Sequence, residues 1–261
     1  MSSVLSIPRI SRRTGKVWRR NLDVFIKTWK VNFFPPLIEA FLYLSAIGLG
    51  IGTYVGSING TPYINFIAPA VLAISAMNSA FFECTYGSYV RMYYQKSFDA
   101  IIATPLSIED VIAGELLWGA TRAVISVTIM LPVLVVFKVV SLPFSILVIP
   151  LAFIGGLTFA GLAMCFTAIT PSIDTLNYPS FLLITPMMLF SGTFFPLTIL
   201  PAVFQYIALA IFPLTHLVSL MRMATLPAIT SLIVLNIAWI LVATVIFCII
   251  SINLMRRRLI V

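Results

Sequence analysis

The chain has 261 residues, of which 61% are hydrophobic and only 9% are charged, and its net charge is +8 at pH 7. Soluble domains use about 25% charged residues, so this composition excludes an ordinary soluble protein and predicts an all-α integral membrane protein. The apolar runs leave no space for a further soluble domain of about 100 residues or more. We therefore expect any energy-converting domain to be a separate chain. The basic residues flank apolar runs, which favours a membrane surface over nucleic acid as their partner.

Residues 1–31 form a basic N-terminal segment with the pattern of an amphipathic helix. At 100° per residue, Trp18, Leu22, Phe25 and Trp29 share one face, and most charged side chains lie on the opposite face. We expect this helix to lie in the membrane interface, with its aromatic rings in the acyl boundary and its cations among phosphates. A basic solvated tail is the alternative, but it does not explain the phase of the tryptophans.

Residues 32–254 are expected to form one membrane domain of six transmembrane helices. The apolar runs are long enough to cross about 30 Å of hydrocarbon as helices. Turn-forming residues such as Pro143 and Pro171 separate some of them. The expected spans cover residues 32–55, 63–89, 107–136, 144–169, a fifth run that starts near 178, and 228–253.

Residues 193–227 precede the last span and are interrupted by Pro196, Pro201 and Pro213. The prolines leave two apolar pieces, 200–212 and 214–226, each too short to cross the membrane. We expect a re-entrant helix pair that dips in from the extracytoplasmic side. Irregular backbone at that depth needs cover from protein or from a water-lined cavity, so this region is a candidate for shaping a substrate exit.

The distribution of basic residues predicts the orientation. Eight of them precede the first span, Arg91 and Lys96 lie in the central loop, and residues 255–261 form a basic tail. The opposite side has only Lys138 and Arg222. By the positive-inside rule, both termini and the central loop are expected in the cytoplasm.

The central loop, residues 91–110, is the only internal segment dense in charge. Ser97 is placed to cap a short helix with Asp99 in its first turn, and Pro105 ends that helix. A Ser-x-x-Asp capping box, Ser107 to Asp110, begins the third span.

The short helix of this loop carries the apolar side chains Phe98, Ile101 and Ile102. An ordinary loop between spans is one interpretation. An apolar surface that faces water favours a second interpretation, in which another protein covers this helix.

Glu39 and Glu83 are the notable charges inside the predicted spans, one to three turns from the cytoplasmic surface. Carboxylates at that depth cost about 2.5 to 3.5 kcal/mol on insertion scales and usually face a bundle interior or a pathway. They are candidates for a substrate gate, or for a latch to Arg91 or Arg122. The alternative is a water-exposed pair that snorkels to the interface. Arg91 and Glu115 complete the set of intramembrane gate candidates.

Gly48, Gly52 and Gly56 recur every four residues at the outer end of the first span. Small residues at this spacing let another helix approach closely. The stripe is therefore the candidate interface with a second copy of the chain.

Several kinds of chemistry are absent from the sequence. No Gly-x-x-x-x-Gly-Lys-Ser/Thr loop occurs, so we expect the chain to hold no ATP itself. The cysteines Cys84, Cys165 and Cys248 lie in apolar runs without C-x-x-C spacing, which predicts packing rather than a disulfide or metal site. No serine and aspartate accompany His216 at a recognisable catalytic spacing, so no catalytic residue and no cofactor are expected. His216 and Arg222 fit interfacial anchors better than ligands.

The amphipathic N-terminal helix, the six spans, the central loop and the late proline-rich segment together resemble the type 2 ATP-binding-cassette exporter permeases. The match covers essentially the whole chain. The chain is most similar to the nodulation-factor (lipooligosaccharide) export permeases, through Pro62-Tyr63-Ile64, Ser75-Ala-Met77, Phe82-Glu83, Thr104-Pro105-Leu106, Gly114-Glu115-Leu116 and Arg256-Arg-Arg258-Leu.

This resemblance implies a homodimer of permeases in the bacterial plasma (inner) membrane, bound to two ATP-binding-cassette ATPase subunits that hold ATP and Mg. The chain would be a transport subunit rather than an enzyme. Its cargo would be a lipid-linked saccharide, a glycolipid or a similar amphipathic molecule, moved out of the cytoplasm or the inner leaflet. A drug or lipid efflux permease of the same superfamily is the alternative. A non-transporting membrane scaffold and an ion-driven carrier are more distant ones.

The resemblance also implies roles for particular residues. ATP-driven closure of the ATPases would push two coupling helices together and open a path between the permeases. The coupling residues would be Phe98, Asp99, Ala100, Ile101, Ile102, Ala103, Thr104 and Pro105. The re-entrant pair, residues 199–226, would lie near the outer mouth, where the candidates are Gly192, Phe195, Pro196, Pro213, His216 and Arg222.

Overall fold

The computed structural model describes residues 8, 10–58, 60–140, 144–226 and 232–259. These residues form a bundle of helices with one small hairpin, β1 (Ser57–Ile58) and β2 (Thr61–Pro62). Five helices are long and apolar enough to cross a membrane, or six if one bent pair counts as a span. The all-α membrane class is thereby confirmed. Parts of the predicted terminal segments, re-entrant segment and last span lie outside the described residues, at 1–7, 9, 227–231 and 260–261.

The first half of the chain forms a leading helix, two composite spans, a short helix and a third span. The leading helix is α1 (Thr14–Lys27). The first span, Trp29–Val55, contains α2 (Trp29–Leu42), the π-helical η1 (Tyr43–Ile51) and α3 (Gly52–Val55). The second, Tyr63–Tyr94, contains α4 (Tyr63–Phe82), η2 (Glu83–Gly87) and η3 (Val90–Tyr94). The short helix is α5 (Ser97–Ile102), and the third span is α6 (Ile108–Val136).

The second half begins with η4 (Phe144–Leu147) and α7 (Val148–Ile169). A run of short helices follows, namely η5 (Asp174–Leu176), α8 (Asn177–Pro179), η6 (Ser180–Ile184) and α9 (Thr185–Phe190). After η7 (Leu197–Ile199) come α10 (Ala202–Ile211) and α11 (Pro213–Thr225), and the last helix is α12 (Ile233–Leu259).

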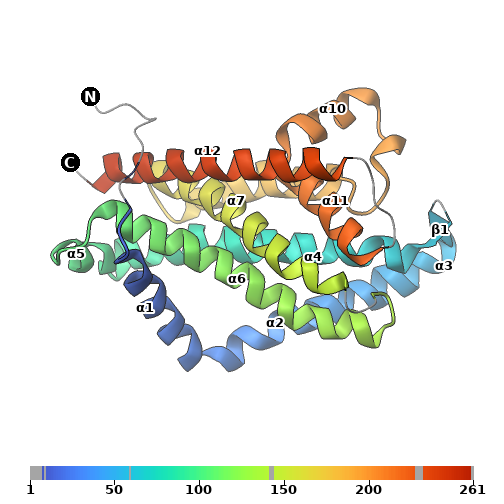
Figure 1. Ribbon diagram of the computed structural model, residues 1–261, viewed down its shortest axis with the longest axis horizontal. Helices are drawn as coiled ribbons and strands as arrows, with labels where there is room; N and C mark the ends of the chain where they lie inside the picture. The colour runs from blue at the N-terminus through green and yellow to red at the C-terminus, as the bar shows by residue number, and fades with distance from the viewer. Residues whose placement is uncertain (1–7, 9, 59, 141–143, 227–231, 260–261) are drawn as a thin grey trace.

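The long helices run between two distinct ends of the molecule (Figure 1). The start of α1, the end of α12 and α5 lie at one end, whereas β1, α3 and α10 lie at the other. The helices α10 and α11 meet at an angle of 86°, as Pro213 predicts, because proline cannot continue the hydrogen bonding of the preceding helix. The predicted pair of short helices before the last span is therefore present.

The core lies where α4, α6 and α7 pack together, and most residues of α4 are buried. Glycines allow the closest approach. A Cβ on Gly119 of α6 would lie 2.5 Å from Cys84 Sγ and 2.9 Å from Ala160 Cβ. A Cβ on Gly156 of α7 would lie 2.7 Å from Ala123 Cβ. The three helices thus cross at distances that only glycine permits at these positions.

The apolar face of α1 does not have the surroundings that its pattern predicts. Trp18 donates a hydrogen bond from Nε1 to Thr121 Oγ1 of α6 at 2.8 Å, and the ring of Phe25 packs edge-on against Trp118 at 5.7 Å. The two rings are half-buried against α6, whereas the sequence pattern predicts the acyl boundary as their surroundings. Trp29, at the start of α2, remains about half exposed.

The glycine stripe of the first span faces its own chain. A Cβ on Gly48 would lie 2.7 Å from Ile64 Cγ1 of α4, and one on Gly52 would lie 3.6 Å from the ring of Tyr63. Gly56 adopts a φ of +69° after the end of α3, a conformation that favours glycine. Of the three glycines that were predicted to contact a second copy, Gly48 and Gly52 therefore face α4 of the same chain, and the backbone conformation accounts for Gly56.

Two predicted segments differ in extent. The run expected to form the fifth span is a series of short helices from Asp174 to Phe190, which at about 1.5 Å per residue reaches about 25 Å. Pro179 and Pro186 lie inside this run and remove backbone donors. The basic tail is not a separate segment, because α12 continues through Arg256–Arg258 to Leu259.

The crossing at Gly119 yields a prediction. We expect Gly119→Ala to destabilise the fold by about 1–3 kcal/mol, because the new methyl group overpacks α6 against Cys84 and Ala160. Gly15→Ala is the matched control, since nothing lies within 4 Å of the position of its Cβ. The measurement is the thermal unfolding midpoint in detergent micelles. Equal midpoints for the two variants would contradict the close crossing.

Candidate functional site

The carboxylate of Glu115 on α6 is fully buried. Arg91 of η3 reaches it with two donors, at 2.9 Å from Nε and 2.6 Å from Nη2, both to Oε2. Ser88 donates to the same oxygen at 2.8 Å, and Asn21 of α1 donates to Oε1 at 2.8 Å. Oε2 therefore has charged and neutral donors, and Oε1 has a neutral one, so both oxygens are hydrogen-bonded, as a buried charge requires.

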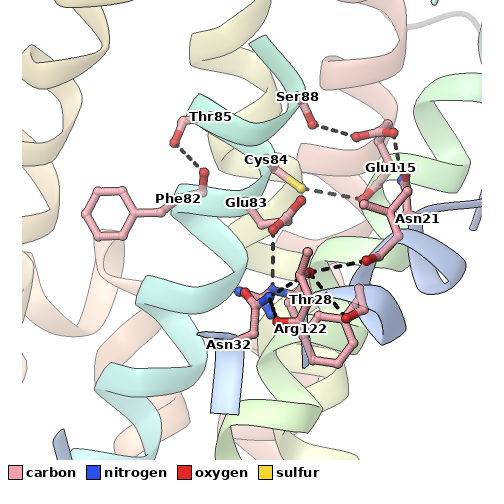
Figure 2. A network of polar contacts seen from close by, with 12 residues as sticks. Asn21, Thr28, Asn32, Phe82, Glu83, Cys84, Thr85, Ser88, Glu115 and Arg122 are labelled. Atoms are coloured by element: carbon pink, nitrogen blue, oxygen red, sulfur yellow. Dashed lines mark hydrogen bonds and ion pairs between the residues drawn. The ribbon is translucent and has the colours of Figure 1, made fainter. Parts of the chain in front are cut away.

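Glu83 lies between two guanidinium groups. Its Oε1 accepts a hydrogen bond from Arg91 Nη1 at 2.8 Å, and its Oε2 lies 3.3 Å from Arg122 Nε. Figure 2 shows Glu83 turned from its helix towards Arg122, with Asn21 and Glu115 beside this pair. Arg91 thus joins the two carboxylates into one network of alternating charge. The predicted latch from Glu83 to Arg91 or Arg122 corresponds to contacts with both.

A cleft of about 430 Å³ opens beside this network. Its charged lining residues are Arg20, Arg91, Arg122 and Glu83, and the rings of Phe25 and Trp118 also line it. Burial lowers the pKa of the Arg20 guanidinium, while Glu115 opposes this shift and Arg91 adds to it. The cleft combines guanidinium groups with aromatic surface.

A second cleft of about 320 Å³ adjoins the first. Both are lined by Asn32, Glu83 and Arg122. The second also includes Glu39, whose Oε2 accepts a hydrogen bond from Ser75 at 3.3 Å. The structure therefore brings Glu83, Arg91 and Glu115 together in one network, whereas Glu39 bonds to Ser75 and shares with Glu83 only the lining of the second cleft.

The short helix α5 lies next to this network along the chain and is anchored by one ring. Phe98 is fully buried, whereas Asp99, Ala100 and Ala103 are exposed. The expectation that Phe98 faces water is wrong, because this ring packs into the core that the spans share. Ile101 and Ile102 are half-buried against the same core. Thr104 and Pro105 extend the exposed side.

The ends of α5 are held differently from what its sequence predicts. Ser97 makes no capping hydrogen bond, and Lys96 takes the cap position with a φ of +49°. The predicted Ser107–Asp110 capping box is present at the start of α6. Asp110 has a second role, because it also accepts hydrogen bonds from Ser11 N at 2.6 Å and Thr14 Oγ1 at 3.1 Å. The start of α1 is thereby bound to the turn after α5.

The sequence matches a known family over most of its length. The profile of the ABC-2 type transporter family covers residues 13–226. The chain belongs to the ABC-2 type transporter family. This range includes α1, the cleft, α5 and the bent helix pair. The chain is a multi-pass membrane permease of this family.

Curated relatives agree with this assignment. The permease is 33% identical to nodulation protein J of Sinorhizobium fredii (strain NBRC 101917 / NGR234), over 93% of this chain and 92% of the relative. It is 35% identical to nodulation protein J of Rhizobium meliloti (strain 1021), with the same two coverages. It is 26% identical to the inner membrane transport permease YadH of Escherichia coli (strain K12), over 72% of this chain and 73% of the relative.

Arg222, a candidate for the outer mouth, makes its contacts with other residues of the permease. Its guanidinium donates to the carbonyl oxygens of Phe66 at 3.2 Å and Gly192 at 2.7 Å, and it lies 3.8 Å from the centre of the Phe66 ring. It therefore ties α11 to α4 and to the loop after α9. Gly192 itself has a φ of +73° at that loop. The neighbouring candidates Phe195 and Pro196 are half-buried.

His216 is also an internal contact and not an interfacial anchor. The ring is 2% exposed, stacks on Trp239 at 4.3 Å, and hydrogen-bonds through Nδ1 to Asn236 at 2.7 Å. Its Nε2 meets the carbonyl oxygen of Leu209 at 3.0 Å. The histidine connects α11 to α10 and α12. Pro213, at the start of α11, is buried as well.

Sequence reasoning missed the part that α1 plays in this site. Asn21 and Arg20 were assigned to a helix in the lipid interface, yet Asn21 binds Glu115 and Arg20 lines the cleft. A signal was present, because Asn21 lies four residues after Val17 and four before Phe25. A polar residue inside an apolar helical stripe indicates a buried polar partner.

The buried pair provides a prediction for the permease. We expect Glu115→Leu to cost about 3–5 kcal/mol of stability, because Arg91 loses its main counter-charge in a buried site. Adding Arg91→Met should recover part of that loss. Thermal unfolding in micelles checks both variants.

Glu109→Leu is the matched acidic control on the same helix. In its pair with Arg256 the side chains are 31% (Arg256) and 14% (Glu109) exposed, whereas Glu115 is fully buried, so we expect a smaller cost than for Glu115→Leu. A double variant, Arg91→Met with Glu115→Leu, that is no more stable than Glu115→Leu alone would contradict the account of the pair.

Proposed function

We propose that this permease is the membrane subunit of an ATP-driven exporter in the bacterial inner membrane, with both termini in the cytoplasm. Two copies would form the path, and two separate ATPase subunits holding ATP and Mg would dock on α5. The position of α5 carries this proposal. It lies at the end of the bundle where α1 begins and α12 ends (Figure 1), and Asp99, Ala100 and the following Ala103 are exposed.

The anchoring of α5 supports a role in transmitting force. Phe98 fixes the helix to the core, and the capping box fixes the turn between α5 and α6. On the other side, the chain continues directly from Arg91, which binds Glu83 and Glu115. A push from a docked ATPase would therefore reach α1, α4 and α6 together. The basic residues at the same end of the bundle support the cytoplasmic placement of α5.

The cargo is proposed to be amphipathic, namely a lipid-linked saccharide or glycolipid that leaves the cytoplasm or the inner leaflet. The likeness to relatives named nodulation protein J, together with the resemblance to lipooligosaccharide export permeases, supports this class. Export of a drug or a simple lipid is the alternative within the family. The name of the Escherichia coli relative, inner membrane transport permease YadH, does not state a cargo.

Substitutions on the exposed side of α5 test the function. We expect Asp99→Arg with Ala103→Arg to reduce export to the level of a strain that lacks the permease, because two long charged side chains would occupy the face on which the ATPase is proposed to dock. Ile102→Glu is a poorer choice, since Ile102 packs against the core. The measurement is the amount of radiolabelled, lipid-extractable saccharide in the medium of cells fed labelled glucosamine.

Thr198→Arg with Ile199→Arg is the matched control. Both side chains are exposed in η7, which directly precedes α10 at the end of the bundle opposite α5. It should leave export unchanged. Antibody detection in the membrane fraction shows that each variant is inserted. Export at the wild-type level by the α5 variant would contradict the docking proposal, and unchanged export after deletion of the permease gene would contradict the cargo class.

A further inference from the structure

The two adjoining clefts share Asn32, Glu83 and Arg122 and form one trough between α1–α2 and α4–α6, with polar and apolar lining residues. The first cleft reaches Gln95 and Ser97 beside α5, and the second reaches Pro35 and Pro36 inside the first span. The trough therefore leads from the end of the bundle into the depth of a candidate span. Together the two clefts have a volume suited to the head group of a small lipid.

The charges around the first cleft do not cancel. Three guanidinium groups, those of Arg20, Arg91 and Arg122, line it, and Glu83 is the acidic side chain among the lining residues. Glu115 lies buried behind Arg91 and adds a second negative charge. One positive charge remains in excess, and an anion would balance it.

Arg20 and Arg122 supply that excess. Arg91 directs its donors to Glu115, Glu83 and Ser88. In contrast, the buried Nε of Arg122 has no hydrogen-bond partner among the described residues, because its 3.3 Å approach to Glu83 lacks hydrogen-bond geometry. Arg20 bonds only its neighbour Asn21 among them, from Nη2 at 3.0 Å. Because Nε of Arg122 is buried, its terminal Nη groups are the donors that this residue can offer to a ligand in the cleft. Arg20 can offer Nε and Nη1, since its bond to Asn21 uses Nη2.

The surroundings of the cleft indicate an amphipathic ligand. Phe25 and Trp118 form an aromatic wall, and Arg122 lies over the Phe25 ring at 5.0 Å. Exposed apolar side chains also line the two clefts, namely Val24 in the first and Phe82 in the second. An acyl chain could lie along the second cleft, against Phe82 and the prolines of α2, while a polar head occupies the first.

We propose that the cleft binds the phosphate-bearing head group of a membrane lipid, with Arg20 and Arg122 as its donors. Phosphate oxygens accept the planar guanidinium fork in a bidentate way and carry the charge that the site lacks. The acyl chain extends along the second cleft. This site is independent of the proposed cargo, because a resident phospholipid and a transported lipid phosphate would both satisfy it.

Binding of dodecyl phosphate tests the site. The full-length permease is purified in dodecyl maltoside micelles, and tryptophan fluorescence is recorded as dodecyl phosphate is added, because Trp118 lines the cleft. We expect Arg20→Gln to weaken binding about tenfold, as the loss of one charge-assisted hydrogen bond does. Arg19→Gln removes the same charge from an exposed position on the same helix and should leave binding unchanged.

A second variant changes the affinity in the opposite direction. Glu83→Gln removes the carboxylate that competes for Arg91 and Arg122, so it should bind dodecyl phosphate more tightly. Inorganic phosphate at the same concentration should not displace the probe. Trp118→Phe should lose most of the fluorescence change, although the other three tryptophans remain.

Three outcomes would overturn the proposal. Equal weakening by Arg19→Gln and Arg20→Gln would show a general charge effect of the micelle. Displacement by inorganic phosphate at equal concentration would identify a free-anion site. A full signal from Trp118→Phe would place the probe elsewhere. None of these outcomes bears on whether α5 docks an ATPase, which the export assay measures separately.

Discussion

The buried carboxylate of Glu115 is the constraint on which the arrangement of this end of the permease depends. An unpaired charge in such a site costs several kcal/mol, so its partners must be present wherever the helix α6 is folded. Those partners come from separate parts of the chain, Asn21 from α1 and Arg91 from η3. The charge therefore dictates that an N-terminal helix, expected at the lipid interface, packs against the bundle. The cleft exists because α1 is held there.

The same network adjoins the helix α5. Five residues separate Arg91 from Ser97, and Lys96 in a left-handed conformation forms the corner between them. Beyond α5, Asp110 closes the capping box and also binds Ser11. Motion of α5 would thus strain contacts to α1 and to the buried ion pair at once. In the proposed exporter, these contacts would transmit ATP-driven closure from α5 to the cleft. The transmission would need no contact at the end of the bundle opposite α5.

Local patterns were predictable from the sequence, whereas the partners of each surface were not. The capping box at Ser107 and the bend at Pro213 follow from short-range rules and are present. The glycine stripe at Gly48 and the aromatic face at Trp18 were recognised, but periodicity does not say what covers a face. In both cases the cover is another helix of the same chain. Likewise, the sequence suggested that His216 is an interfacial anchor, whereas the structure shows that it is buried between helices.

The account rests on α5 being the surface that an ATPase covers. A photo-crosslinking amino acid at Ala103, which is exposed on α5, tests this in living cells, with Thr198 near α10 as the control position. Crosslinked products are identified by mass spectrometry after purification of the tagged permease. The account predicts a P-loop ATPase joined to position 103 and none joined to position 198. A permease that yields no such product at 103, or equal yields at both positions, would contradict it.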